Sequence, residues 1–156
     1  MGNIGRKVAQ IAEDFGMNVC YFSTSGTSHC KDYPSLPLEQ LLAQADIVSV
    51  HAPLNERTDA LIGEKELAMM KPSAYIVNMG RGGIVVEEAL VKAVDEGVIA
   101  GAALDVYSVE PLPEDSCYLK ARHPERFRFA PHVAWASEEA RARLLGMVAE
   151  NIAKGW

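Results

Sequence analysis

Apolar residues along the chain follow two spacings, one typical of helices and one typical of buried strands. Ile4, Val8, Ile11 and Phe15 recur at helical intervals, which predicts an amphipathic helix that ends at Gly16. Short runs of β-branched and other apolar residues predict strands. Polar segments that contain proline or glycine predict the loops between these elements.

The pattern assigns most of the chain to short elements. Strands are expected over residues 19–22, 46–52, 74–79, 99–106 and 127–130. Further helices are expected over residues 38–45, 64–70, 86–97 and 138–153. Ser137 is placed to cap the last helix, and Glu138 and Glu139 suit the positive end of its dipole. Residues 23–37 and 107–126 are expected to be loops.

The order of these elements determines the fold class that we expect. Strands alternate with helices along the chain, and the strands are continuous apolar runs rather than alternating ones. Such runs are typical of a parallel sheet that is covered on both faces. The sequence therefore predicts an α/β, doubly wound fold with a parallel sheet.

Composition excludes several classes of protein. The 156 residues include 21 acidic and 15 basic side chains, a net charge of −6, which disfavours a nucleic-acid partner. No apolar run approaches about 18 residues, so no membrane-spanning helix is expected. Three cysteines at unrelated spacings (Cys20, Cys30 and Cys117) resemble reduced thiols of a cytoplasmic protein, and no metal site is expected.

The chain opens on two glycines, Gly2 and Gly5, at the start of the first helix. This spacing matches the last two glycines of the G-x-G-x-x-G pattern, in which backbone and a helix N-terminus receive a pyrophosphate. Two neighbouring glycines also occur by chance in loops, so the motif alone decides little. The acidic residue expected after the second strand, on the ribose, is replaced by Ser23.

A second glycine-rich segment, Asn78-Met79-Gly80-Arg81-Gly82-Gly83, follows a predicted buried strand. Open α/β sheets bind ligands at the carboxyl ends of their strands. The guanidinium of Arg81, among glycines, offers a planar set of donors that suits a carboxylate. The alternative is a glycine-rich turn with a solvated arginine.

Three more titratable residues lie at or just after predicted strand ends. Asp105 ends the strand over 99–106, Glu110 follows it, and His132 follows the last strand. A carboxylate beside an imidazole fixes its tautomer and suits proton transfer near neutral pH. The alternative is that all three are loop caps. His51 is expected to be a structural or cofactor-wall residue, and His29 a solvated one.

Five stretches resemble, in order, the motifs of the D-isomer-specific 2-hydroxyacid dehydrogenase family. They are GNIGRKVA, ADIVSVHAPLNERTDALI, MKPSAYIVNMGRGGIV, GAALDVYSVEPLP and APHVAWAS, and they span nearly the whole chain. The resemblance implies a Rossmann-type cofactor domain. The implied reaction is hydride transfer between a nicotinamide cofactor and a 2-keto or 2-hydroxy acid.

The resemblance also implies roles for particular residues. Arg81 would hold the substrate carboxylate and keto oxygen, His132 would exchange the hydroxyl proton, and Glu110 would orient the imidazole. The residues implied in cofactor binding are Gly2, Asn3 and Ile4 at the pyrophosphate, Ser23 at the adenosine ribose, Ala52 and Pro53 at the adenine-side wall, and Met79, Gly80, Arg81, Asp105 and His132 around the nicotinamide.

Two details refine this resemblance. HVAWAS, with Trp135, and YFSTSG are similar to the glycerate dehydrogenase branch, also called hydroxypyruvate reductases. Ser23 does not repel a 2′-phosphate, but no arginine follows it and the nearest cation along the chain is Lys31. NAD is therefore the first expectation for the cofactor and NADP the second.

The resemblance further implies what surrounds this chain. Family members run to roughly twice its length, so we expect residues 1–156 to be a fragment of a cofactor domain that lacks its first strand and the substrate domain. A cytoplasmic homodimer is expected for the parent protein, with neither nucleic acid nor membrane as a partner. Two alternatives stay open: an NAD-binding regulatory module of the corepressor kind, and an assembly module without turnover.

Overall fold

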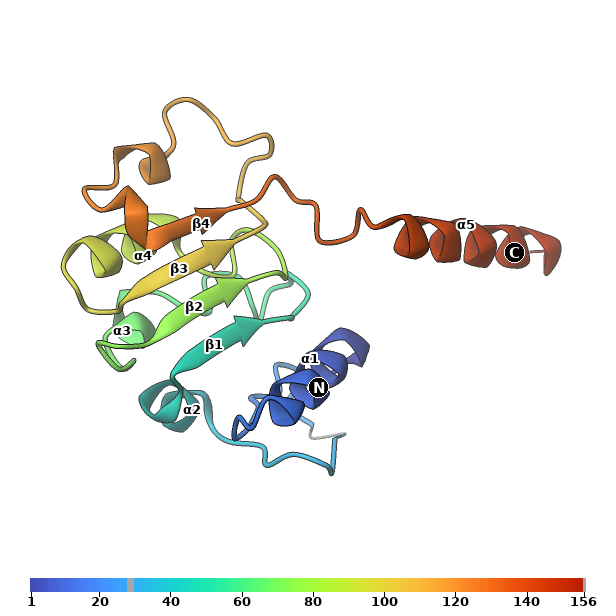
Figure 1. Cartoon of the computed structure of the whole chain (residues 1–156), viewed down its shortest axis with the longest axis horizontal. Coiled ribbons are helices and arrows are strands. Elements are labelled where there is room, and N and C mark those ends of the chain that lie inside the picture. Colours follow the sequence, from blue (N-terminus) through green and yellow to red (C-terminus); the bar gives the residue numbers. More distant parts are fainter. Residues whose placement is uncertain (28–29, 156) are drawn as a thin grey trace.

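A parallel sheet forms the centre of the molecule. The computed structural model describes residues 1–27 and 30–155; the expectation for His29 lies outside them. The strands are β1 (Ile47–Val50), β2 (Tyr75–Asn78), β3 (Gly101–Leu104) and β4 (Phe127–Phe129), paired side by side in the order β1-β2-β3-β4 (Figure 1). Ile47 pairs with Tyr75, which pairs in turn with Gly101. The predicted α/β class with a parallel sheet is confirmed.

The helices lie close to where their patterns predict them. They are α1 (Asn3–Asp14), α2 (Leu38–Gln44), α3 (Glu64–Leu67), α4 (Glu87–Asp95) and α5 (Glu138–Ala153), with short 3₁₀ helices η1 (Cys117–Lys120) and η2 (Pro124–Arg126). Gly16, with φ +81°, follows the end of α1, and Ser137 Oγ accepts from Ala140 N–H at the start of α5. Both end signals are therefore confirmed.

One face of the sheet forms the core. Val48, Ile76 and Leu104 point to this face and share one buried cluster with Leu67 of α3 and Leu90 of α4. On the other face the side chains of Ile47 and Tyr75 are 51% and 50% exposed. The apolar strands predict a sheet that is covered on both faces, whereas in the described residues this second face is partly exposed at Ile47 and Tyr75. An apolar strand indicates that its side chains are covered by other apolar groups, but its composition does not specify which segment covers them.

The prediction of a strand over residues 19–22 is wrong. Within the described residues only Tyr21 pairs there, in an isolated parallel bridge with Ser35. Tyr21 N–H donates to Pro34 O and Leu36 N–H donates to Tyr21 O. An apolar run becomes a ladder only when a neighbour satisfies its backbone groups in succession, and a single bridge does not.

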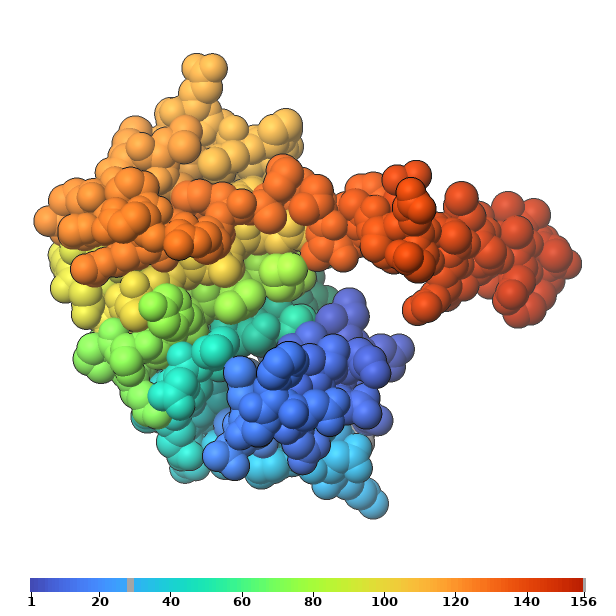
Figure 2. Space-filling view, viewed as in Figure 1, coloured from blue at the N-terminus to red at the C-terminus, as the bar shows by residue number. Residues whose placement is uncertain are grey.

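The final helix stands apart from the sheet. Figure 1 and Figure 2 show α5 extending away from the rest of the molecule. No residue of α5 is buried, and Leu144, Leu145 and Ile152 are exposed. None of the described helices is long and apolar enough to cross a membrane. The described residues also contain no cluster of three or more histidine, cysteine or acidic side chains that could hold a metal.

Candidate active site

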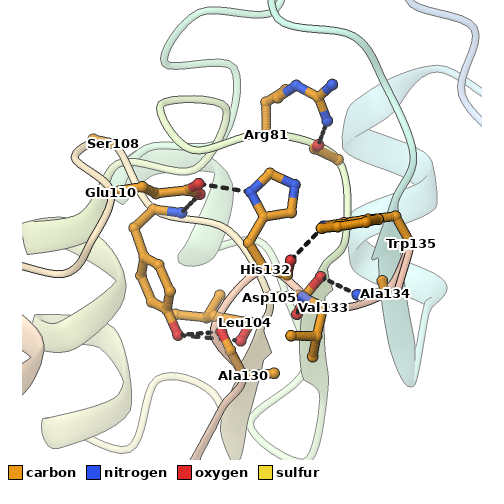
Figure 3. A network of polar contacts seen from close by, with 12 residues as sticks. Arg81, Leu104, Asp105, Ser108, Glu110, Ala130, His132, Val133, Ala134 and Trp135 are labelled. Carbon is orange, nitrogen blue, oxygen red and sulfur yellow. Dashed lines mark hydrogen bonds and ion pairs between the residues drawn. The ribbon is translucent and has the colours of Figure 1, made fainter. Parts of the chain in front are cut away.

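The candidate site lies at the carboxyl ends of the strands. Ala52 follows β1, Arg81 follows β2, Asp105 follows β3 and His132 follows β4. Because the strands are parallel, their carboxyl ends share one edge of the sheet. The fold thus brings together residues that are far apart in the sequence (Figure 3).

The loop that presents Arg81 is fixed by the buried Asn78. The side-chain oxygen of Asn78 accepts from Gly80 N–H at 3.1 Å, and its amide nitrogen donates to Arg81 O at 3.0 Å. Arg81 Nη1 donates to Gly80 O at 2.8 Å. The backbone of the loop is therefore tied down, while the Arg81 side chain remains exposed to a ligand.

Two glycines allow three loops to pack backbone against backbone. A Cβ on Gly80 would lie 2.8 Å from Ala52 O, in the loop after β1. A Cβ on Gly82 would overlap the carbonyl of Tyr107, in the loop after β3. No larger residue fits at Gly82 without moving that backbone. The glycines around Arg81 thus set the distance between Arg81 and its neighbouring loops.

His132 and Glu110 form a short polar contact. His132 Nδ1 lies 2.6 Å from Glu110 Oε2, and Tyr107 N–H donates to Glu110 Oε1 at 3.0 Å. The hydrogen bond from His132 lowers the pKa of Glu110, with further lowering by the Tyr107 N–H and the positive charge of Arg81. Glu110 is therefore an ionised acceptor, so Nδ1 carries the proton and Nε2 is the nitrogen left for a substrate.

Arg81 completes this group of side chains. Figure 3 shows Arg81, Glu110 and the imidazole of His132 on one side of the site, with Asp105 on the opposite side of His132. The charge of Arg81 acts on Glu110, which agrees with their proximity. The three residues that we predict as catalytic are thus assembled at one place, and their roles remain predictions.

The backbone of His132 adopts an uncommon conformation that its neighbours hold in place. Its φ is +53°, in the left-handed region that non-glycine residues rarely adopt. Trp135 Nε1 donates to His132 O at 2.7 Å. Asp105, 2% exposed, accepts from Val133 N–H at 2.8 Å and from Ala134 N–H at 2.9 Å. Asp105 and Trp135 together fix the turn that contains His132.

This backbone role of Asp105 was not among our predictions from the sequence. We predict Asp105 as a nicotinamide ligand, and that role stays a prediction. The contacts that it makes join residues 28 and 29 positions apart. Such a contact leaves no local signal in the sequence beyond a polar residue at the end of an apolar strand.

The start of α1 provides a second feature of the site. Gly2 is the N-cap residue, and no side chain caps the helix there. The first-turn N–H groups have no acceptor within the helix, and the helix dipole places positive potential beside them. Such a terminus attracts anions, and a pyrophosphate is one of them. The described residues at this position therefore fit a dinucleotide.

An open cleft continues from this helix terminus toward Arg81. Its lining residues belong to α1 and to the loops after β1 and β2. They are Ile4, His51, Ala52, Pro53, Leu54, Met79, Gly80 and Arg81. Most of the residues predicted at the cofactor therefore share one surface. Ser23 does not line this cleft and lies in a separate loop of hydroxyl side chains.

His51 forms part of the cleft wall. Its Nε2 lies 2.9 Å from Ser49 Oγ, whereas its buried Nδ1 has no hydrogen-bond partner among the described residues. Burial lowers the pKa of His51. A neutral imidazole with one unsatisfied nitrogen beside the cleft suits a wall residue, the role that we predict for it.

Comparison with known proteins decides the family. Residues 1–134 match the family model described as D-isomer specific 2-hydroxyacid dehydrogenase, NAD binding domain. The chain belongs to this family. The matched residues form the NAD-binding domain of this family, in agreement with the uncapped terminus of α1 and the cleft beside it.

Relatives of this dehydrogenase domain include enzymes with different names. It is 45% identical to a glyoxylate reductase of Korarchaeum cryptofilum, over 97% of this chain and 46% of that protein. It is 38% identical to a glycerate dehydrogenase of Methylorubrum extorquens, over 97% and 46%. The structure of an acyclic imino acid reductase (Bsp5) in complex with NADPH and D-Arg matches with a TM-score of 0.88, 32% identity, and coverage of 97% and 47%. The chain thus spans about half the length of the relatives that it matches.

One residue beside the loop of Ser23 in this dehydrogenase domain is missing from our predictions. Arg57, in the loop after β1, reaches the loop of Ser23 and donates from Nη1 to Ser25 O at 3.3 Å. Lys31 is the nearest cation to Ser23 along the chain. The contact of Arg57 joins residues 32 positions apart, so spacing along the chain does not reveal it.

Proposed function

We propose that this chain is the cofactor-binding and proton-transferring part of a D-2-hydroxyacid dehydrogenase. The observation that supports this most directly is the 2.6 Å contact between His132 and Glu110, beside Arg81 (Figure 3). Arg81 also lines the cleft that reaches Ile4 in the first turn of α1. The chemistry that the bound nicotinamide supplies is hydride transfer. The protein has to orient the keto acid and provide a proton.

Each of the three side chains has a distinct task in this proposal. Arg81 donates to the substrate carboxylate and to the keto oxygen, which polarises the carbonyl as negative charge develops on that oxygen. His132 gives a proton from Nε2 to the same oxygen, and takes it back in the reverse direction. Glu110 keeps the ring oriented and offsets the positive charge of the imidazolium.

The substrate that we propose is hydroxypyruvate, with D-glycerate as the reduced product. HVAWAS is similar to the glycerate dehydrogenase branch, and Trp135 places a 58% exposed indole beside the backbone of His132. Glyoxylate is the second candidate, because a relative with 45% identity is named a glyoxylate reductase. The two acids differ by a hydroxymethyl group, so their relative rates of turnover distinguish the two candidates.

The test compares keto acids in the presence of NADH or NADPH and separates turnover from binding. We expect oxidation of the cofactor with hydroxypyruvate to exceed that with glyoxylate and pyruvate. His132→Gln lowers kcat by roughly 100-fold because the proton donor is lost, and it changes cofactor affinity far less than kcat. Arg141→Gln on α5 is the matched control and leaves both unchanged. Equal turnover by the His132→Gln protein would disprove the proposed role.

A regulatory or assembly role predicts another result from the same experiment. A module that only senses the cofactor binds NADH and does not oxidise it with any keto acid, whether or not His132 is present. We also propose that the parent enzyme is a homodimer. Sedimentation of the protein over a range of concentrations tests this, since a sedimentation coefficient that stays at the monomer value contradicts it.

A further inference from the structure

Three hydroxyl side chains gather in the loop that follows the extended segment around Tyr21. Ser23 Oγ donates to Thr27 O at 2.6 Å and lies 3.1 Å from Ser25 Oγ. Ser25 Oγ also lies 3.2 Å from both Thr27 O and Thr27 Oγ1. The single proton of Ser25 thus has several alternative acceptors, all long, so it can turn toward a ligand at little cost.

A cation from a different part of the fold reaches this loop. Arg57 Nη1 donates to Ser25 O at 3.3 Å. Hydrogen bonds tie the loop of Arg57 together, because the fully buried Thr58 donates to Pro53 O at 2.6 Å and accepts from Asn55 N–H at 2.9 Å. Arg57 N–H itself donates to the Asn55 side chain at 2.9 Å. The backbone of Arg57 is therefore held in place beside the hydroxyl loop.

The electrostatics around Arg57 favour an anion. Across residues 1–27 and 30–155 its guanidinium forms no ion pair with any carboxylate, although Glu56 and Asp59 lie on the same loop. The loop of residues 23–27 contains no acidic side chain. Dinucleotide folds that select NAD place a carboxylate at this position on the ribose hydroxyls, and such a carboxylate repels a 2′-phosphate.

We propose that Arg57, Ser23 and Ser25 form a subsite for a phosphate monoester on the adenosine ribose, so that this domain prefers NADPH to NADH. The proposal rests on the proposed function, since it concerns the same cofactor. Arg57 supplies the charge and two or more N–H donors, and Ser25 supplies a hydroxyl donor. Ser23 braces the loop through Thr27 O and presents no negative charge to the phosphate.

The test measures the cofactor preference of the chain by fluorescence titration with NADPH and NADH. Wild type is expected to bind NADPH more tightly. Arg57→Gln is expected to lower the NADPH-to-NADH affinity ratio by about tenfold, because one charge-assisted contact is lost. Arg141→Gln, the same change of charge on α5, keeps the wild-type ratio. A wild type that prefers NADH, or an unchanged ratio in Arg57→Gln, overturns the proposal.

A second variant and a smaller probe separate this proposal from the proposed function. Ser23→Asp, which restores the carboxylate, is expected to reverse the preference toward NADH. Adenosine 2′,5′-bisphosphate should bind more tightly than adenosine 5′-monophosphate, and added salt should reduce this difference. If the subsite is absent, the two adenosine probes bind equally while turnover of the keto acid is intact. If the proposed function fails, turnover is absent whatever the adenosine probes show.

Discussion

Individual residues in the site act in pairs, and Glu110 with His132 is the clearest pair. Because the pKa of Glu110 is lower in the folded chain than in an unfolded one, its ionised form favours the folded state. This contribution is present above the usual carboxyl range and is lost as the pH falls through the lowered pKa. Glutamine cannot titrate, so a protein with glutamine at position 110 does not lose stability in this way as the pH falls.

Glu110→Gln is therefore expected to reduce the free energy of unfolding at neutral pH and to match the wild type in acid. The difference at neutral pH stays below about 1 kcal/mol, since the side chains of His132 and Glu110 are 35% and 33% exposed and water screens their interaction. Urea denaturation at several pH values measures it, with the exposed Glu114→Gln on the same loop as control. A difference that persists unchanged in acid contradicts this origin.

Trp135 tests whether the turn around His132 matters for proton transfer. Trp135→Phe keeps an aromatic ring but removes the indole N–H that donates to His132 O. We expect kcat to fall by roughly fivefold, the effect of losing one hydrogen bond, while KM for the cofactor changes little. A change confined to KM would mean that Trp135 shapes binding instead of holding His132.

Asp105 should have a larger effect than Trp135, because its buried carboxylate accepts two backbone N–H groups. Asn at this position keeps one oxygen acceptor and turns an amide donor toward another donor. Asp105→Asn is expected to cost about 1–3 kcal/mol of stability, measured by thermal or urea unfolding. Wild-type stability in this variant would show that the clamp on Val133 and Ala134 is dispensable.

At the level of elements, close packing of loops explains the glycines around Arg81. Gly82→Ala places a methyl group on the carbonyl of Tyr107 and is expected to destabilise the chain by more than about 2 kcal/mol. Gly146→Ala in α5 is the matched control, because its Cβ meets no atom within 4 Å. That control is expected to be neutral or stabilising by up to about 1 kcal/mol. Equal unfolding midpoints for the two variants would contradict the packing argument.

Elements that depend on local spacing could be predicted from the sequence. The stripe of Ile4, Val8 and Ile11 gives α1, and the apolar runs before Asn78 and Asp105 give β2 and β3. The segment around Tyr21 is also apolar but forms only one bridge, with Ser35. A strand needs a neighbouring strand to pair with, and composition does not specify that neighbour.

The candidate site was predictable only in part, for a similar reason. Arg81, Glu110 and His132 follow strands that are parallel, so their convergence follows from the topology. The contacts of Asp105 with the turn after His132, and of Arg57 with Ser25, join distant segments across loops. Loop geometry of this kind depends on packing and leaves no periodic pattern in the sequence.

At the scale of the whole molecule, the candidate site lies on an open surface. Arg81 is exposed, and the cleft from Ile4 to Arg81 is open to solvent. Proton and hydride transfer are most efficient where water is excluded. We therefore expect the 156-residue chain to bind the cofactor and to turn over a keto acid slowly. Turnover at the median rate of enzymes, about 10 per second, would contradict this expectation.

We expect a dinucleotide to bind at the start of α1, and one variant at Gly2 tests this expectation. Gly2→Asp adds a side chain that caps the helix, where Gly2 now has no atom within 4 Å of an added Cβ. The same carboxylate would lie at the helix N-terminus, where we predict the pyrophosphate, and would repel it.

The measurement is a fluorescence titration of wild type and Gly2→Asp with NADH and NADPH, alongside thermal unfolding of both proteins. We predict saturable binding by the wild type. In Gly2→Asp we predict an affinity at least about tenfold weaker, together with an unfolding midpoint that is equal or higher. A folded wild type that binds neither cofactor, or a Gly2→Asp protein that binds as tightly as the wild type, would show that no dinucleotide binds at the start of α1.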